Sequence, residues 1–246
     1  MKKNILHILA AAAMLALALA AAPAFGAEAQ FERNFKVKGQ VQLSVGTSGE
    51  GTIHLTVGRS DRVHVVGHVR SNWGGNVDDR VAKYADSPPV EQVENIIRVG
   101  SPNDSTRHMT VDYEVEAPAD AFVYAIASAG NVVDEGVGMN VKLATGSGDI
   151  HATGLKGALE ATSNTGDIEI GGTPTKDWHI TTDGNVEFWV ANAGVALEAR
   201  ADAGRIDFDR PQPAEVVADK HHVATKLNGG GPEVKIESAT GMIRIH

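Results

Sequence analysis

The sequence predicts an all-β protein built as a β-solenoid, a stack of similar coils, with an N-terminal β-hairpin region and one short helix. The first observation is a glycine that recurs every 18 residues, at Gly130, Gly148, Gly166 and Gly184. The second is that each glycine precedes a polar and then an aliphatic residue: Asn131-Val132, Asp149-Ile150, Asp167-Ile168 and Asn185-Val186. The third is a second apolar series with the same period, at Val123, Val141 and Leu159.

Residues 1–26 are expected to be a secretory signal peptide. Lys2 and Lys3 precede a run of residues 5–22 in which His7 is the one polar side chain, and Pro23 ends the run. Small residues then fit cleavage after residue 26 or residue 29. The run is also long enough for an uncleaved membrane anchor, which is the alternative. Cleavage predicts a protein exported to the periplasm or the exterior, without stable membrane insertion.

The composition argues against nucleic acid as a partner. The net charge is −9, and removing the leader leaves 20 basic and 31 acidic residues, a net charge of −11. Nucleic-acid binding needs a basic surface, whereas this balance suits a protein outside the cytoplasm. The chain has no cysteine, so its stability must come from packing without disulfides.

Residues 30–246 are predicted to form a single β-solenoid domain, of which residues 30–122 hold strands, hairpins and the helix. Residues 40–45 and 53–57 alternate apolar with polar side chains. The alternation resumes at Val63 and Val65 after the turn-forming residues 58–61, which predicts a hairpin.

The predicted helix spans residues 77–85, with Val77, Val81 and Tyr84 or Ala85 on one face. Pro88-Pro89 prevents its continuation. Residues 90–93 and 96–99 flank Glu94-Asn95 and predict a second hairpin, and strand alternation returns at residues 111–115.

Residues 123–246 are predicted to be repeated coils. Within a coil, two apolar positions lie seven residues apart on either side of a turn, as Leu143 and Ile150 do. Positive φ is expected at the turn glycines, which are Gly130, Gly148, Gly166, Gly184, Gly204 and Gly241. The register slips by a residue around 178–190, residues 209–232 are an insertion, and the coil at 234–245 is expected to close the stack.

Repeated Thr-Gly-Ser-Gly-Asp-Ile-like units carry a resemblance to a known family. They stand at residues 145–150 and 164–168, with looser copies at 183–186 and 240–243. With the segments at 88–92 and 113–118, they make residues 31–246 similar to the bacterial "putative adhesin" family, an exported domain of unknown function. The resemblance implies a right-handed parallel β-helix-like fold, and it implies neither an established activity nor catalytic residues.

The candidate binding residues form what we call the acidic column: Asn131, Asp149, Asp167, Asn185, Glu169 and Glu187. Coils stack about 4.8 Å apart, so the first four would lie above one another. The two glutamates, with His151, would form a row beside them. Stacked carboxylates repel one another unless they are protonated, screened or bridged by a cation, and oxygen ligands of this kind suit Ca²⁺. The preferred alternative is that the Asx side chains bind turn backbone and the face is solvated.

Other candidates for chemistry are weaker. His54, His64 and His68 share strand parity, but no nearby carboxylate or cysteine completes a metal site, so we predict neither metal nor cofactor. Trp178 and Trp189 are expected to pack in the core or between coils. Trp73, in a glycine-rich loop, is the candidate for contacting a partner.

The predicted function is non-enzymatic: an exported β-solenoid that presents an extended acidic surface to an envelope protein, a glycan or another cell. Motifs of serine hydrolases, zinc proteases and phosphate-binding loops are missing. The alternative is a carbohydrate-active enzyme, a polysaccharide lyase or glycosidase on a parallel β-helix. Its nearest catalytic equivalents would be Asp149, Asp167, Arg205 and Lys235.

Overall fold

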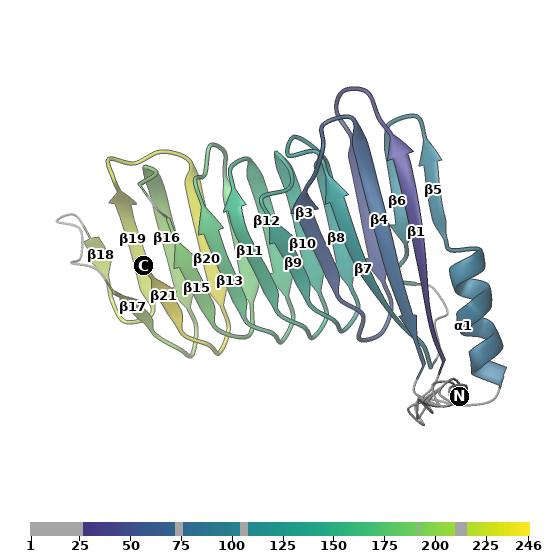
Figure 1. The fold of residues 1–246 in the computed structure, drawn as a ribbon. Helices are drawn as coiled ribbons and strands as arrows, with labels where there is room; N and C mark the ends of the chain where they lie inside the picture. Colours follow the sequence, from purple (N-terminus) through teal and green to yellow (C-terminus); the bar gives the residue numbers. More distant parts are fainter. Residues whose placement is uncertain (1–26, 72–75, 104–107, 191, 210–215) are drawn as a thin grey trace, which may run out of the picture.

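The computed structural model describes residues 27–71, 76–103, 108–190, 192–209 and 216–246. The predicted signal peptide and the loop that contains Trp73 lie outside these residues. The described part of the chain forms two large sheets that face each other across one core, with one helix at the N-terminal end (Figure 1).

The first sheet has eleven strands. In spatial order they are β18 (Val216–Ala218), β19 (His222–Leu227), β16 (Val195–Ala201), β20 (Glu233–Ser238), β14 (Trp178–Thr182), β12 (Ala158–Ser163), β10 (Asn140–Thr145), β8 (Phe122–Ala127), β2 (Gln42–Thr47), β6 (Ile96–Gly100) and β5 (Val90–Val93).

The second sheet has ten strands. In spatial order they are β1 (Glu28–Lys36), β4 (Arg62–Arg70), β7 (Thr110–Ala117), β3 (Ile53–Val57), β9 (Val132–Glu135), β11 (Ile150–Leu155), β13 (Ile168–Gly172), β15 (Val186–Trp189), β21 (Ile243–Ile245) and β17 (Ile206–Phe208).

Each coil contributes one strand to each sheet, and the strands of neighbouring coils pair in parallel. In β10, for example, Val141 lies opposite Leu159 of β12 and opposite Val123 of β8. The predicted β-solenoid with parallel sheets is therefore confirmed. The register slip is confirmed as well, because Leu159 pairs with Trp178, 19 residues away, while Ile168 still pairs with Val186.

The order of coils in space differs from their order in the chain. The coil of β20 and β21 lies between the coil of β14 and β15 and the coil of β16 and β17. Figure 1 shows these late strands between earlier ones. The prediction that residues 234–245 close the stack is therefore wrong. Within the predicted insertion, β19 instead pairs antiparallel with β16 and extends the sheet beyond it.

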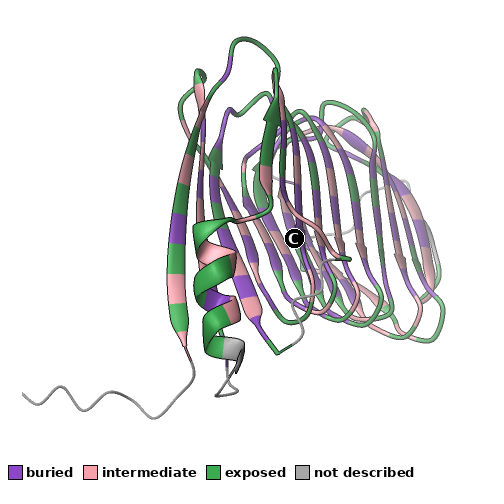
Figure 2. Cartoon of the chain, turned by 90° about the vertical axis from the view of Figure 1, so that its right-hand side faces the viewer, coloured by how far each residue is buried: buried purple, intermediate pink, exposed green. Residues whose placement is uncertain are grey.

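The core is an aliphatic ladder, as the period of 18 predicted. Val132, Ile150, Ile168 and Val186 pair in register and are at most 1% exposed. Ile53 and Ile243 extend the ladder in both directions. Ala125, Ala152, Ala161 and Ala199 are completely buried, so small side chains fill part of the core. Along the stacked strands, buried positions alternate with exposed ones (Figure 2).

The N-terminal region holds one wrong and two confirmed predictions. The hairpin expected between β3 and β4 does not form, because β7 lies between them and pairs with both. β5 and β6 do form the predicted hairpin. Helix α1 (Asn76–Asp86) also forms, with Val81 buried and its packing directed against β1 and β4. Within the described ranges no helix has the length and apolar character needed to cross a membrane.

Candidate functional site

The predicted turn glycines occupy the corner where each coil passes from the eleven-stranded to the ten-stranded sheet. Positive φ was expected there, and this is wrong for all six glycines. Positive φ occurs instead at other glycines, for example at Gly136 after β9 and at Gly154 near the end of β11. The reason for glycine is close approach: a Cβ on Gly148 or Gly166 would lie well under 3.0 Å from the glycine carbonyl of the adjacent coil.

Buried hydroxyl groups link these glycines from coil to coil. Ser163 Oγ donates to the carbonyl of Gly148 at 2.9 Å and accepts from the N–H of Gly166 at 2.9 Å. The same pair of bonds is made by Thr145, Thr182 and Ser238. We did not predict this role from the sequence. The signal for it is a hydroxyl residue two or three positions before Gly148, Gly166, Gly184 and Gly241.

Removing one hydroxyl should leave two buried polar groups without partners. We expect Ser163→Ala to lower the free energy of unfolding by about 1–3 kcal/mol. Ser163→Thr should retain most of that stability, because Thr145 and Thr182 occupy the same position in neighbouring coils. Urea denaturation of the three proteins measures the difference. Equal midpoints for Ser163→Ala and the parent would contradict this role.

Directly after the glycines, the Asx residues of the acidic column form a second ladder. Asn131 Oδ1 accepts from the N–H of Asp149 at 2.9 Å, and Asp149 Oδ1 accepts from the N–H of Asp167 at 2.8 Å. Asp167 and Asn185 continue the ladder to the N–H of Met242. The side chains therefore bind the backbone of the next coil, a form of the preferred alternative. Each remains exposed.

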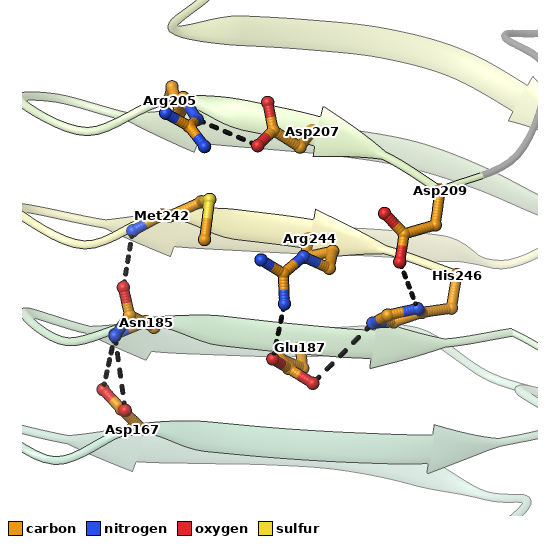
Figure 3. A network of polar contacts seen from close by, with 9 residues as sticks. All are labelled: Asp167, Asn185, Glu187, Arg205, Asp207, Asp209, Met242, Arg244 and His246. Carbon is orange, nitrogen blue, oxygen red and sulfur yellow. Dashed lines mark hydrogen bonds and ion pairs between the residues drawn. The ribbon is translucent and has the colours of Figure 1, made fainter.

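The neighbouring outward row is held by ion pairs. His151 Nδ1 lies 3.0 Å from Glu169 Oε2, and Arg244 donates to Glu187 Oε1 at 3.0 Å. Figure 3 shows Glu187 between Arg244 and His246, and shows Asp167 beside Asn185. The imidazole of His246 also stacks on Trp189, with ring centroids 4.3 Å apart. Trp189 thus packs between coils as expected, and Trp178 is buried in the core.

The two rows line a groove of about 490 Å³ on the ten-stranded sheet. All six residues of the acidic column are among its lining residues. The groove has four carboxylates, from Asp149, Asp167, Glu169 and Glu187, against the guanidinium of Arg244 and the imidazole of His151. Its surface is therefore acidic, and the ladder of backbone hydrogen bonds holds its spacing.

A calcium site in this groove stays unsupported by geometry. One oxygen of each aspartate already accepts a backbone N–H, and the described residues contain no group of three or more side chains placed to hold a metal. We expect millimolar Ca²⁺ to raise the melting temperature no more than a sodium control of equal ionic strength. A Ca²⁺-specific rise that disappears in Asp149→Asn/Asp167→Asn would contradict this expectation.

The three N-terminal histidines lie on two separated strands and each faces a carboxylate. His54 contacts Glu135 at 2.9 Å, His64 contacts Glu32 at 3.0 Å, and His68 contacts Glu114 at 3.5 Å. Strand β7 separates His54 from the other two. No carboxylate was found close to these histidines in the sequence. The carboxylates that they contact come from other strands or from distant positions in the chain, so the sequence did not reveal them.

The residues named for the enzymatic alternative do not converge. Arg205 precedes β17 in the ten-stranded sheet and pairs with Asp207 at 2.8 Å. Lys235 lies on β20 in the other sheet and pairs with Glu237 at 3.0 Å. Asp149 and Asp167 thus share a face with Arg205 but not with Lys235.

One carboxylate points into the core, which we did not predict. Asp134 is completely buried and lies in register with Ala152 and Leu55. Its Oδ1 accepts from the N–H of Val137 at 2.8 Å, while its Oδ2 has no hydrogen-bond partner among the described residues. Burial raises the pKa of Asp134 to about 7. The sequence does contain a signal for this burial: Asp134 follows Val132 by two residues on the same strand, so both side chains point to the core.

This raised pKa makes stability depend on pH. The carboxyl stays protonated in the folded chain up to about pH 7, whereas the unfolded chain releases its proton near pH 4. Below pH 4 the Asp134 carboxyl is protonated in both states and does not reduce the free energy of unfolding. As pH rises from 4 to 7 only the unfolded chain releases this proton, so the free energy of unfolding of the parent falls. The difference in free energy of unfolding between Asp134→Asn and the parent should therefore grow in favour of the variant from pH 5 to pH 8, by on the order of a few kcal/mol. Urea denaturation at both pH values measures this. Asp120→Asn, an exposed control, should show no such gain, and a constant difference for Asp134→Asn would contradict the prediction.

Comparison with known proteins finds a family model that is similar to the repeats. Residues 126–246 match the family model described as Toastrack DUF4097, and no curated protein matches the chain. A putative cell adhesion protein from Clostridium sporogenes ATCC 15579 is similar at 13% identity and a TM-score of 0.49, over 88% of this chain and 99% of that one. A putative adhesin from Bacteroides fragilis NCTC 9343 is similar at 13% identity and a TM-score of 0.35, over 89% and 97%. The resemblance drawn from the repeats is confirmed.

Proposed function

We propose that this chain, whose residues 126–246 match the Toastrack DUF4097 family model, is an exported, non-enzymatic binding protein whose acidic groove contacts a partner at the cell envelope. The observation that carries the proposal is the groove itself. Four carboxylates outnumber the positively charged groups that line it, and a ladder of backbone hydrogen bonds fixes the positions of two of them, those of Asp149 and Asp167.

The negative charge of the groove favours a positively charged partner. Glu169 and Glu187 are already paired with His151 and Arg244, whereas Asp149 and Asp167 keep an exposed carboxylate after binding the backbone. A positively charged segment of an envelope protein complements these two aspartates. The repeated coils form a long flat face, which suits an extended segment better than a compact ligand.

Asparagine substitution tests the proposal without disturbing the ladder. Asn131 and Asn185 already occupy this column, so Asp149→Asn/Asp167→Asn removes two charges and keeps both acceptors. Immobilised parent protein should retain an oligolysine peptide and a set of envelope proteins at low salt, and the double variant should retain less of both. Asp86→Asn/Asp120→Asn, which removes the same charge from exposed positions elsewhere, is the control.

Two results would overturn the proposal. One is equal retention by the parent and the double variant, which would mean that the groove does not select the partner. The other is reproducible release of reducing ends or unsaturated products from a polysaccharide panel that is lost in the double variant, which would favour the enzymatic alternative.

A further inference from the structure

The outer face of the eleven-stranded sheet carries a second surface, unlike the acidic groove. Phe122 and Tyr124 both point outward from β8 and are 38% and 44% exposed. They are two of the five large hydrophobic side chains that are exposed in the described part of the chain. Aromatic side chains are scarce here, at 5% of residues, so two on one exposed strand face suggest a contact surface.

The parallel register extends each aromatic into a row across neighbouring strands. Phe122 lies between Gln42 and Asn140, and Ile96 and Val93 continue its row to the edge strand β5. Tyr124 lies between Ser44 and Lys142, and Arg98 continues its row. One row is therefore apolar with two amides. The other is polar, with Arg98 and Lys142 inside it and the carboxylates of Glu91 and Glu160 opposite them on the flanking strands. Of the strands that carry these rows, β5, β6, β8 and β10 are labelled in Figure 1, and β2 lies between β6 and β8.

The two rows line a groove of about 510 Å³. Its lining includes two cationic side chains, Arg98 and Lys142, and no carboxylate. Lys142 is paired with Glu160. Arg98 is exposed and forms no ion pair with any residue that the structure describes, so it is the groove's available cation.

We propose that this groove binds a glycan that carries carboxylate groups, such as a chain of uronic acids. A pyranose ring has a face of C–H groups, which complements the electron-rich face of Tyr124 or Phe122. Its hydroxyl rim matches the amides of Gln42 and Asn140. The planar guanidinium of Arg98 fits a carboxylate through two parallel hydrogen bonds.

The negative net charge of the chain does not prevent this contact. The acidic groove lies on the other sheet, and charges separated by more than about 8 Å are largely screened at physiological ionic strength. The contact at Arg98 is short-range. The proposal is independent of the acidic groove, because the two sites share no residue.

The test measures binding of two oligosaccharides to the full protein by isothermal titration calorimetry. Oligogalacturonate is the carboxylated probe and a malto-oligosaccharide of equal length is the neutral one. We expect the parent to bind oligogalacturonate at least about tenfold more tightly than the neutral probe. Arg98→Gln should remove that preference, and Tyr124→Ala should weaken binding of oligogalacturonate by a similar factor.

Three control proteins make the outcome decisive. Arg200→Gln removes an exposed arginine from β16 of the same sheet and should bind like the parent. Asp149→Asn/Asp167→Asn should also bind like the parent, which separates this site from the acidic groove. Arg98→Lys should bind more weakly than the parent, because a lysine cannot make the bidentate contact. Melting curves establish that each variant is folded, as expected for exposed positions.

The proposal is overturned if the parent binds neither probe at millimolar concentration, or if it binds both equally. It is also overturned if folded Arg98→Gln keeps the preference for oligogalacturonate, or if binding is lost in Asp149→Asn/Asp167→Asn instead.

Discussion

Ile150→Asp is expected to abolish the cooperative folding of the repeat region. Ile150 is 1% exposed and pairs with Val132 and Ile168 in the middle of the aliphatic ladder. A carboxylate there has no partner, and burying it should lower the free energy of unfolding by roughly 5 kcal/mol or more. Circular dichroism during heating should then show no cooperative transition near that of the parent.

Ile150→Val is the matched control for this position. It removes one methylene group and keeps an apolar, branched side chain, so it should lower the free energy of unfolding by only about 1 kcal/mol. If Ile150→Asp melts like the parent, Ile150 does not lie in the core and the ladder is wrong.

Gly166→Ala is the second change with a large expected effect. A Cβ at Gly166 would overlap the backbone carbonyl of Gly148 in the adjacent coil, and backbone cannot move aside as a flexible side chain can. The coils would have to separate and strain the hydroxyl and Asx ladders at the same corner. We expect a loss of roughly 3 kcal/mol or more in the free energy of unfolding.

Gly171→Ala separates this effect from the general effect of replacing glycine in a strand. The nearest atom to a Cβ at Gly171 is Trp189 Cβ at 3.5 Å, an ordinary contact, and its φ is not positive. Thermal melts of both variants measure the contrast. Similar melting temperatures for the two would show that close approach between coils is not the reason for glycine. If Gly166→Ala loses far less stability than Gly166→Val, this would also argue against close approach as the reason for glycine, because the overlap with the Gly148 carbonyl begins at the Cβ.

Local patterns predicted the parts of the fold that depend on residues near one another in the chain. Val132, Ile150, Ile168 and Val186 were placed in one ladder because a constant period gives every coil the same inward positions. Helix α1 and the β5–β6 hairpin also follow from contacts within a few residues. The acidic column was predicted for the same reason, since residues at one place in the repeat must stack when the coils do.

The failed predictions concern partners that are distant in the chain. The β3–β4 hairpin was inferred from adjacency, but β7, which begins 40 residues after the end of β4, takes the place between the two strands. The glycine conformation was inferred from the turn alone, although the constraint comes from the carbonyl of another coil. Asp134 was overlooked because its isolation depends on both sheets, which bury it and give its Oδ2 no hydrogen-bond partner among the described residues.

The sequence by itself determined that the chain forms stacked β-coils, which side chains point inward, and which polar residues lie in register on one face. Period and parity suffice for these because they are properties of each coil and are copied along the chain. Only the tertiary structure decided that β20 and β21 lie between earlier coils, and that Ser163 and its counterparts join the glycines. It also decided that Arg98 and Tyr124 lie in one row across three strands, with Ser44 between them. Similar coils offer similar pairing edges, so the choice among them rests on packing over the whole stack rather than on any local pattern.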